Sequence, residues 1–453
     1  MNCIPRPPRL LLALSLLLSG MAVAETLHEQ ALTQLRAGHP AEALALARQD
    51  LAATQAASLE QLAVVTSLTT LADTEAALHA DSDAETHYRQ ALSLDEKLHG
   101  DEQASLDASL LRLADFHASR YHFAEALPLY QRRVSIFEAA YGPDHPAVAE
   151  RLLALAAFQQ AQGHYQAAGP LFERALAIDS QEFGPGARAT VERMGDLAGF
   201  YVAARQFAKA EKLYRRMLDI QAATTGLDPV YRARTLEALA ELEIWEQEFR
   251  SAGRHLRAAG VIYSGALGDN RLALAANSGL QADGLRLAGK PAEAEPLYQQ
   301  VLGQYQALSG TADALPGLLD HAALNSAALG QDTEALKRFA QAQALYRQSL
   351  GPESAGLAQS LNELADFQLG RKNPDAAEPL FRQALAMRTK VLGPDHPAVA
   401  ESLLGLARMY IARRQHAPAE SLMQQALVLE EQAYGRGSEL MQTLQSALQD
   451  IGK

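Results

Sequence analysis

The sequence predicts an all-α fold, a right-handed α-solenoid of tandem helix-turn-helix units. The first observation is a period, since glycines recur with gaps of 42 residues and one gap of 41. The second is composition: Ala and Leu dominate while Val, Ile and Thr are few, which favours helix throughout. A fixed period of roughly 20–50 residues is the signature of a solenoid. The periodic glycines are Gly100, Gly142, Gly184, Gly226, Gly268, Gly310, Gly351, Gly393 and Gly435.

Residues 1–24 have the layout of a secretory signal peptide. Arg6 and Arg9 precede an apolar run over residues 10–18, and residues 22–24 form a small-x-small cleavage site. We expect cleavage before Glu25 and export to the periplasm or the medium. The alternative is an uncleaved membrane anchor, although so short an apolar run spans a bilayer poorly. No other apolar stretch is long enough to cross a membrane, so we expect no membrane span after cleavage.

Charge and cysteine content exclude several classes of function. The formal net charge is −13, and removal of two arginines with residues 1–24 makes it −13 − 2 = −15. This charge argues against nonspecific binding to nucleic acid or to anionic membranes. Cys3 is the only cysteine, so the mature chain has none. Disulfides, thiolate metal sites and cysteine nucleophiles are therefore excluded.

After the signal peptide the chain divides into three predicted parts. Residues 25–57 form one divergent helix pair, with Gly38-His39-Pro40 as its turn. Residues 58–435 form nine tandem repeats of 42 residues, one of them a residue shorter. Residues 436–453 supply a helix that covers the last apolar face, as the terminal unit of a solenoid requires.

Within a repeat, residues are numbered here by repeat position, counted from the joint glycine as zero. Positions 10, 13, 14 and 17 are apolar at helical spacing, and so are positions 26, 30, 33 and 34. Each repeat is therefore a first and a second helix, with a turn near position 21. Position 26 is alanine in every repeat, which suits a close helix crossing, and position 30 is usually aromatic.

The joint between repeats contains an Asp-His pair that could suggest metal or acid–base chemistry. Residues 142–150 and 393–401 carry the same nine letters, including Asp144-His145 and Asp395-His396. Each pair stands just before a proline that suits the first helical position, where a polar residue can cap free amides. We interpret both pairs as structural.

These positions resemble the tetratricopeptide repeat, and the 42-residue period with Gly-Pro-Asp-His-Pro at the joint resembles its kinesin light chain type. The resemblance covers about residues 26–450 and indicates an exported bacterial member of that family. It implies a protein or peptide partner held along a concave groove that the first helices line. That family often carries Leu-Asn-Asn-Leu-Ala in the first helix, and only residues 361–365 come near it here. Its ligand preference is therefore not implied.

The resemblance implies that positions 8, 11, 12, 15, 18 and 19 face the groove. Acids at these positions outnumber arginines, which favours a basic or polyamine-like ligand. The alternative is that an acidic protein has acidic faces everywhere. Trp245 is either a groove anchor or packed against a neighbouring repeat. The candidate partner-binding residues are Asp73, Asp115, Glu150, Glu192, Asp196, Glu237, Glu241, Trp245, Asp283, Asp320, Asn362, Glu363, Asp366 and Glu401.

No motif for catalysis or for a cofactor is present. The histidines lack the spacing of a metalloprotease helix, and there is no nucleophile elbow, phosphate loop or dinucleotide fingerprint. We therefore expect no catalytic residue, no metal and no cofactor. The function predicted is a non-catalytic scaffold that binds a peptide segment or a partner domain in its groove. The alternative is a structural subunit of an envelope or secretion assembly that acts through its convex face or its ends.

Overall fold

The computed structural model describes residues 27–56, 61–100, 104–224, 228–266, 269–308, 314–435, 444–446 and 448. Within these residues all regular structure is helical, and the prediction of an all-α solenoid of paired helices is confirmed. The predicted signal peptide lies outside the described residues, as do Gly226, Gly268 and Gly310. The chain forms two compact units, Met1–Phe158 and Gln159–Lys453.

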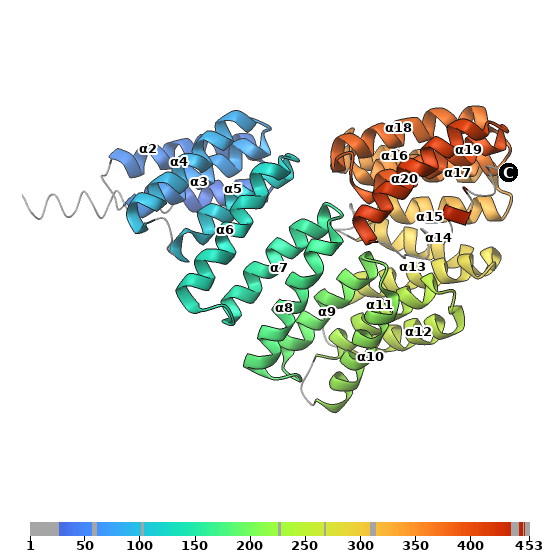
Figure 1. Cartoon of the computed structure of the whole chain (residues 1–453), viewed down its shortest axis with the longest axis horizontal. Coiled ribbons are helices and arrows are strands. Elements are labelled where there is room, and N and C mark those ends of the chain that lie inside the picture. The colour runs from blue at the N-terminus through green and yellow to red at the C-terminus, as the bar shows by residue number, and fades with distance from the viewer. Residues whose placement is uncertain are drawn as a thin grey trace, which may run out of the picture. The chain divides into compact units, whose positions relative to one another are not determined.

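The first unit consists of helix pairs joined by tight turns (Figure 1). A helix over residues 27–36 pairs with α2, and first and second helices then alternate up to α7, which extends past residue 158. The bounds are α2 Pro40–Ala56, α3 Gln61–Ala77, α4 Asp81–His99, α5 Asp107–Ser119 with a 3-10 turn Ala104–Leu106 before it, α6 Phe123–Tyr141 and α7 Pro146–Ala161.

The second unit continues the same alternation. Its first helices are α9 Arg188–Ala203, α11 Pro229–Trp245, α13 Arg271–Leu287, α15 Leu315–Ala328, α17 Ala355–Gly370 and α19 Pro397–Ala412. Its second helices are α8 Tyr165–Phe183, α10 Phe207–Ala223, α12 Phe249–Gly265, α14 Pro291–Ala307, α16 Asp332–Leu350, α18 Pro374–Leu392 and α20 His416–Tyr434.

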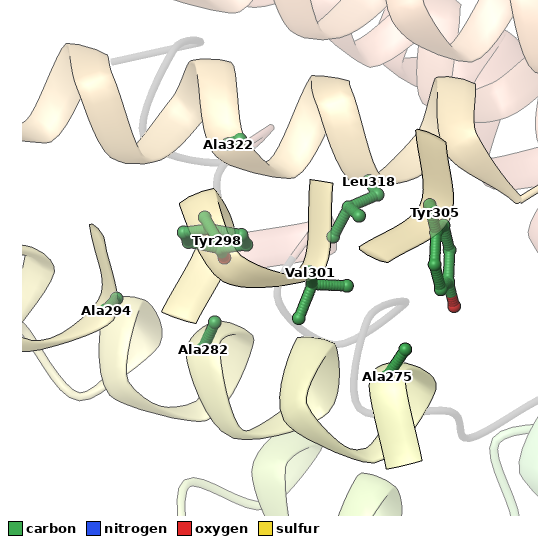
Figure 2. Packing of buried hydrophobic residues seen from close by; sticks show 8 residues of the cluster. All are labelled: Ala275, Ala282, Ala294, Tyr298, Val301, Tyr305, Leu318 and Ala322. Atoms are coloured by element: carbon green, nitrogen blue, oxygen red, sulfur yellow. The ribbon is translucent and has the colours of Figure 1, made fainter. Parts of the chain in front are cut away.

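The small and aromatic positions of the repeat make the core. Every alanine at position 26, from Ala84 to Ala419, is at most 1% exposed, so the helices of a pair cross closely there. The aromatic side chain at position 30, one helical turn after that alanine, fills the space next to the crossing. Figure 2 shows Tyr298 of α14 between Ala282 of α13 and Ala322 of α15, and Tyr298 is fully buried. One aromatic ring thus joins three helices of two repeats.

Glycines at the joints supply a backbone conformation that other residues rarely adopt. Gly142 and Gly393 have φ of 91° and 92° with ψ of 156°. This region is open almost only to glycine. Three residues later the histidine caps the next helix, because Nδ1 of His145 and of His396 accepts a hydrogen bond from a backbone amide two residues on, at 3.1 Å in both cases. This capping supports the interpretation of both Asp-His pairs as structural.

The first helices form the inner layer in each unit. Consecutive first helices contact each other directly: α3 with α5, α11 with α13, α13 with α15, α15 with α17 and α17 with α19. No two consecutive second helices of the described chain approach as closely. In a curved array of two layers, the layer whose helices lie closer together is on the inside of the curve. The surface that the first helices present is therefore concave.

In the second unit the last repeat returns to the beginning, and α20 contacts α8. The rings of Tyr165 and Tyr434 stack with centroids 5.0 Å apart. The guanidinium of Arg205 lies 4.8 Å from the centre of the Tyr434 ring and 3.4 Å from a carboxylate oxygen of Glu430. Burial raises the pKa of Glu430, and Arg205 opposes that rise. These contacts fix the curvature of the second unit.

The C-terminal segment is described only in part. Residues 444–446 are helical, and Leu444 is buried against Ala407, Ala419 and Met423 of the last repeat. The remainder of the predicted capping helix lies outside the described residues. Across the described chain, the helices are all too short or too polar to cross a bilayer.

Candidate functional site

All the predicted partner-binding residues lie on first helices, the inner layer of the repeats. They are Asp73 on α3, Asp115 on α5, Glu150 on α7, Glu192 and Asp196 on α9, Glu237, Glu241 and Trp245 on α11, Asp283 on α13, Asp320 on α15, Asn362, Glu363 and Asp366 on α17, and Glu401 on α19. Their partners decide which of them a ligand could reach.

A tyrosine–carboxylate pair recurs within the repeats, between position 15 of the first helix and position 30 of the second. The hydroxyl of Tyr88 donates to Asp73 at 2.5 Å, and the hydroxyl of Tyr130 donates to Asp115 at 2.5 Å. In the second unit Tyr298 donates to Asp283 at 2.6 Å. A buried hydroxyl needs such an acceptor, so these aspartates stabilise the repeat and are only partly available to a ligand.

A second set of hydrogen bonds joins consecutive first helices, from position 11 of one repeat to position 9 of the next. The three bonds are Asn277 to Glu237 at 2.9 Å, Ser360 to Asp320 at 2.7 Å, and Asn362 to Ser402 at 3.0 Å. Asp320 is 2% exposed and Asn362 is 7% exposed. The prediction that these two residues face the groove is therefore corrected. At position 11 the helix already faces the next repeat, and the side chain lies in that interface.

Several of the remaining acids are paired with arginines. The pairs are Glu150 with Arg151, Glu192 with Arg188, Asp196 with Arg193, Asp366 with Arg408, and Glu401 with Arg388. Glu363 accepts a hydrogen bond from Gln359 at 2.8 Å, and its other carboxylate oxygen is buried. The excess of acids in the sequence thus overstates the free negative charge of the inner surface.

Glu241 and Trp245 differ from the other predicted residues. Glu241 is exposed and has no hydrogen-bond or ion-pair partner among the described residues. Trp245, one helical turn further along α11, is 67% exposed. The alternative in which Trp245 packs against a neighbouring repeat does not fit this exposure, because most of the indole lies in solvent.

The acids of the inner surface have pKa values shifted by their surroundings. Although its side chain is exposed, desolvation by the surrounding protein raises the pKa of Glu241. The neighbouring carboxylate of Asp283 raises this pKa further, and the charge of His321 opposes the rise. Burial likewise raises the pKa of Glu237 and of Asp73, although the tyrosine hydroxyl opposes the rise in each case. Asp283 is the exception: burial raises its pKa, but the hydrogen bonds from His321 and Tyr298 and the charges of His321 and Arg286 together outweigh burial and leave the value lowered.

Two residues of this surface, Tyr214 and Gly199, were not among those predicted from the sequence. Tyr214 occupies position 30 in α10, but position 15 of the same repeat is Gly199, so the usual carboxylate is absent. The signal was present in the sequence, because Tyr88, Tyr130 and Tyr298 all have an aspartate fifteen residues before them. Comparing positions 15 and 30 across the repeats would have identified Tyr214 as the exception.

Among the described residues no group of three or more His, Asp or Glu side chains is arranged to hold a metal ion. The inner surface instead offers side chains that can form hydrogen bonds, ion pairs and aromatic contacts with another molecule.

Comparison with known proteins agrees with this architecture. Residues 151–223, 317–390 and 358–429 match one tetratricopeptide repeat family, and residues 108–147 match another. A search of the curated proteins found no match.

Solved structures with similar repeats include three informative examples. The nearly identical tetratricopeptide-like repeats of a kinesin light chain from Podosopora anserina are 26% identical, cover 45% of this chain and 96% of their own, and give a TM-score of 0.39. BtubC from P. vanneervenii is 19% identical, with 54% and 94% covered and a TM-score of 0.40. The apo form of RapI is 13% identical, with 81% and 98% covered and a TM-score of 0.51. The likeness to RapI concerns the fold alone.

Proposed function

Because this chain is built of tetratricopeptide repeats, we propose that it is a non-catalytic scaffold that binds an extended segment of a partner protein along the inner surface of its second unit. The observation that carries the proposal is the exposure of Trp245, 67% in solvent on an inner helix. A large aromatic side chain on a concave surface is the kind of residue that dominates binding energy at interfaces. Its neighbours on α9, α11 and α13 belong to one compact unit.

The inner surface suits an extended segment for a geometric reason. Consecutive first helices are held side by side by the position 11 to position 9 hydrogen bonds, so their exposed side chains form successive rows. A segment lying across these rows meets one helix after another. Since the rows are preformed, the scaffold loses little conformational freedom when the segment binds.

The test compares charge reversal on the inner and outer helices. The inner variant carries Glu192→Lys, Asp196→Lys and Glu241→Lys, and the outer variant carries Glu182→Lys, Asp219→Lys and Glu293→Lys. All six residues lie in the second unit. Each variant replaces three acids by three lysines, so the two variants change net charge equally. Partners are captured with each variant from an envelope extract and compared with those of the parent chain.

The proposal expects the inner variant to lose a partner that the outer variant retains. The reverse result would instead support a structural subunit that acts through its convex face. Circular dichroism and thermal unfolding of both variants check that each one is folded.

We also propose that the chain is exported with residues 1–24 as its signal peptide. The support is the arrangement of Arg6 and Arg9 before the apolar run and of Ala22-Val23-Ala24 after it. Expression of the full chain in a Gram-negative host, followed by fractionation and N-terminal sequencing, tests this. The expected product begins at Glu25 and is found outside the cytoplasm, whereas an intact chain in the cytoplasm would reject the proposal.

A further inference from the structure

The tyrosine–carboxylate pair fails in two consecutive repeats of the second unit, and the two failures lie next to each other. In the repeat of α9 and α10, Tyr214 is present but Gly199 stands in place of the acid. In the repeat of α11 and α12, Glu241 is present but Leu256 stands in place of the tyrosine. One repeat thus has a donor without its acceptor, and the next has an acceptor without its donor.

Tyr214 is an unusual buried tyrosine. Its side chain is 6% exposed, yet its hydroxyl has no hydrogen-bond partner among the described residues. Burial raises the pKa of Tyr214 to about 12, and the carboxylate of Glu241 contributes to that rise. The phenol therefore remains a hydrogen-bond donor at any physiological pH, and Glu241 is near enough to act on it electrostatically.

Open space lies at Gly199, the position where the complete pairs carry the acid. Gly199 is exposed, and a Cβ added there would meet no atom within 4 Å. In the complete pairs this position carries an aspartate that reaches the tyrosine. The absence of a side chain at Gly199 leaves a gap on the inner surface where another molecule can approach Tyr214.

An exposed aromatic side chain lies next to Glu241. Trp245 follows Glu241 by one helical turn, so both side chains lie on the same face of α11. On the neighbouring helix α13, Leu287 occupies the same repeat position as Trp245 and is 51% exposed. Glu241 and Trp245 thus place a carboxylate and an indole next to each other on the inner helix α11.

Among the described residues, Glu241 has no direct ion-pair partner. On α9, Glu192 and Asp196 are paired with Arg188 and Arg193. On α13, Asp283 repels Glu241, whereas His321 of α15, which is paired with Asp283, attracts it without direct contact. On α11 itself Arg234 lies about two helical turns away from Glu241.

We propose that Gly199, Tyr214, Glu241 and Trp245 form a pocket for a lysine or arginine side chain of the bound segment. This inference rests on the proposed function, since it names the chemistry of the segment that the inner surface binds. The cation pairs with Glu241 and its methylene stem lies on the indole of Trp245, an arrangement that cation–π attraction also favours. The hydroxyl of Tyr214 donates to a backbone carbonyl of the segment that enters the gap at Gly199.

Trp245 is the only tryptophan of the chain, so its fluorescence reports on this pocket directly. The probes are two short capped alanine–serine peptides that differ only in a central lysine or glutamine. Both are titrated at low salt into the chain lacking residues 1–24, with fluorescence and calorimetry as readouts. We expect the lysine peptide to bind about 10-fold more tightly than the glutamine peptide, because a charged hydrogen bond at this site adds about 1.4 kcal/mol.

Three variants, compared with one control, separate the parts of the pocket. Glu241→Gln should abolish the preference for lysine, whereas Glu211→Gln, which removes a charge of the same sign from a paired acid on the outer helix α10, should preserve it. Tyr214→Phe should weaken both peptides by a similar factor. Gly199→Leu fills the gap with a side chain that the repeat of α15 already carries at this position, as Leu324, and should prevent binding without loss of helical stability.

Equal affinity for the two peptides, or an unchanged preference in Glu241→Gln, would overturn the pocket. If the inner variant described above still loses its partner in that case, the proposed function stands and only the lysine pocket is rejected. If neither the partner nor either peptide responds to changes on the inner helices, the proposed function itself is rejected.

Discussion

The hydroxyl of Tyr298 donates a hydrogen bond to one carboxylate oxygen of Asp283 at 2.6 Å. Nδ1 of His321, in the next repeat, is hydrogen-bonded to the other oxygen of the same carboxylate at 2.9 Å. Asp283 of α13 therefore contacts both α14 of its own repeat and α15 of the next repeat. Tyr298 is fully buried among the residues shown in Figure 2, so its hydroxyl has no access to bulk water as an alternative partner. The same arrangement without the histidine recurs at Asp73 and Asp115.

Removal of the hydroxyl should be costly at Tyr298 and nearly neutral at Tyr214. Tyr298→Phe removes the hydrogen bond to one carboxylate oxygen of Asp283, and we expect it to lower stability by about 1–2 kcal/mol. Tyr214→Phe removes a hydroxyl that has no partner in the described chain, so we expect a change within about 0.5 kcal/mol. Amide hydrogen exchange in α13–α15 and in α9–α11 measures the two local effects. Equal losses in the two variants would show that the hydrogen bond to Asp283 contributes little.

The pair of Asp283 and His321 predicts a pH dependence of stability. Burial lowers the pKa of His321, but the hydrogen bond to Asp283 and the charges of Asp283 and Glu363 together outweigh burial and raise the value above 6.5. The pKa of Asp283 is lowered below 3.8. The histidine contribution is complete below pH 6.5 and is lost as the pH rises through the raised pKa. The aspartate contribution is complete above pH 3.8 and is lost as the pH falls through the lowered pKa.

The pair should therefore stabilise the protein most between these two values. We expect His321→Gln to cost about 0.5–1 kcal/mol at pH 5.5 and less at pH 8, since the histidine side chain is partly exposed and solvent screens the pair. Urea unfolding of both proteins at the two pH values measures the difference. A cost that is the same at both values would contradict the assignment.

For Asp320 we predict a pH dependence of stability opposite to that for Asp283, because the pKa of Asp320 is raised. Burial raises the pKa of this carboxyl from 3.8 to about 8, although Ser360 donates a hydrogen bond to it. The folded protein then keeps a proton that the unfolded chain releases, so stability falls as the pH rises from 3.8 to about 8. Asp320→Asn removes this linkage and still accepts the bond from Ser360.

We expect Asp320→Asn to match the parent chain below pH 4 and to exceed its stability by about 2 kcal/mol or more at pH 8. Denaturation midpoints across this range measure the difference. A variant that is less stable than the parent at pH 8 would show that Asp320 is ionised and favourably paired in the folded protein.

The sequence predicted the repeat and its packing well, because these depend on local pattern. Alanine at position 26 and an aromatic at position 30 can be recognised from spacing alone, and the structure buries both. The inner surface was predicted less well. Successive helix positions differ by about 100° around the axis, so position 11 falls at the border between groove and interface. Asp320 and Asn362 lie on the interface side of that border.

Contacts between distant repeats could not be predicted in the same way. The return of α20 to α8 depends on a small rotation at each repeat, accumulated along the second unit. No local pattern fixes that sum. Tyr165 and Tyr434 have no feature in the sequence that indicates their stacking.

The contact between the two ends of the second unit also involves Gly163 and Pro397. Gly163 forms the turn before α8 with φ of 75°, and a Cβ at Gly163 would lie 2.1 Å from Cδ of Pro397 in α19. Gly330 forms the equivalent turn before α16 with the same φ of 75°, and a Cβ there would meet nothing within 4 Å. A substitution at either glycine would therefore place a side chain on the same left-handed backbone conformation. Only at Gly163 would that side chain also collide with Pro397.

Gly330→Ala should cost about 1 kcal/mol, the strain of an alanine with positive φ. Gly163→Ala should cost about 1–3 kcal/mol more, because the methyl group forces Pro397 away and separates α8 from α20. Hydrogen exchange should then rise at the start of α19 and at the end of α20 in Gly163→Ala alone. If both variants lose the same stability and α20 keeps its protection, the contact between α8 and α20 does not hold the unit closed in solution.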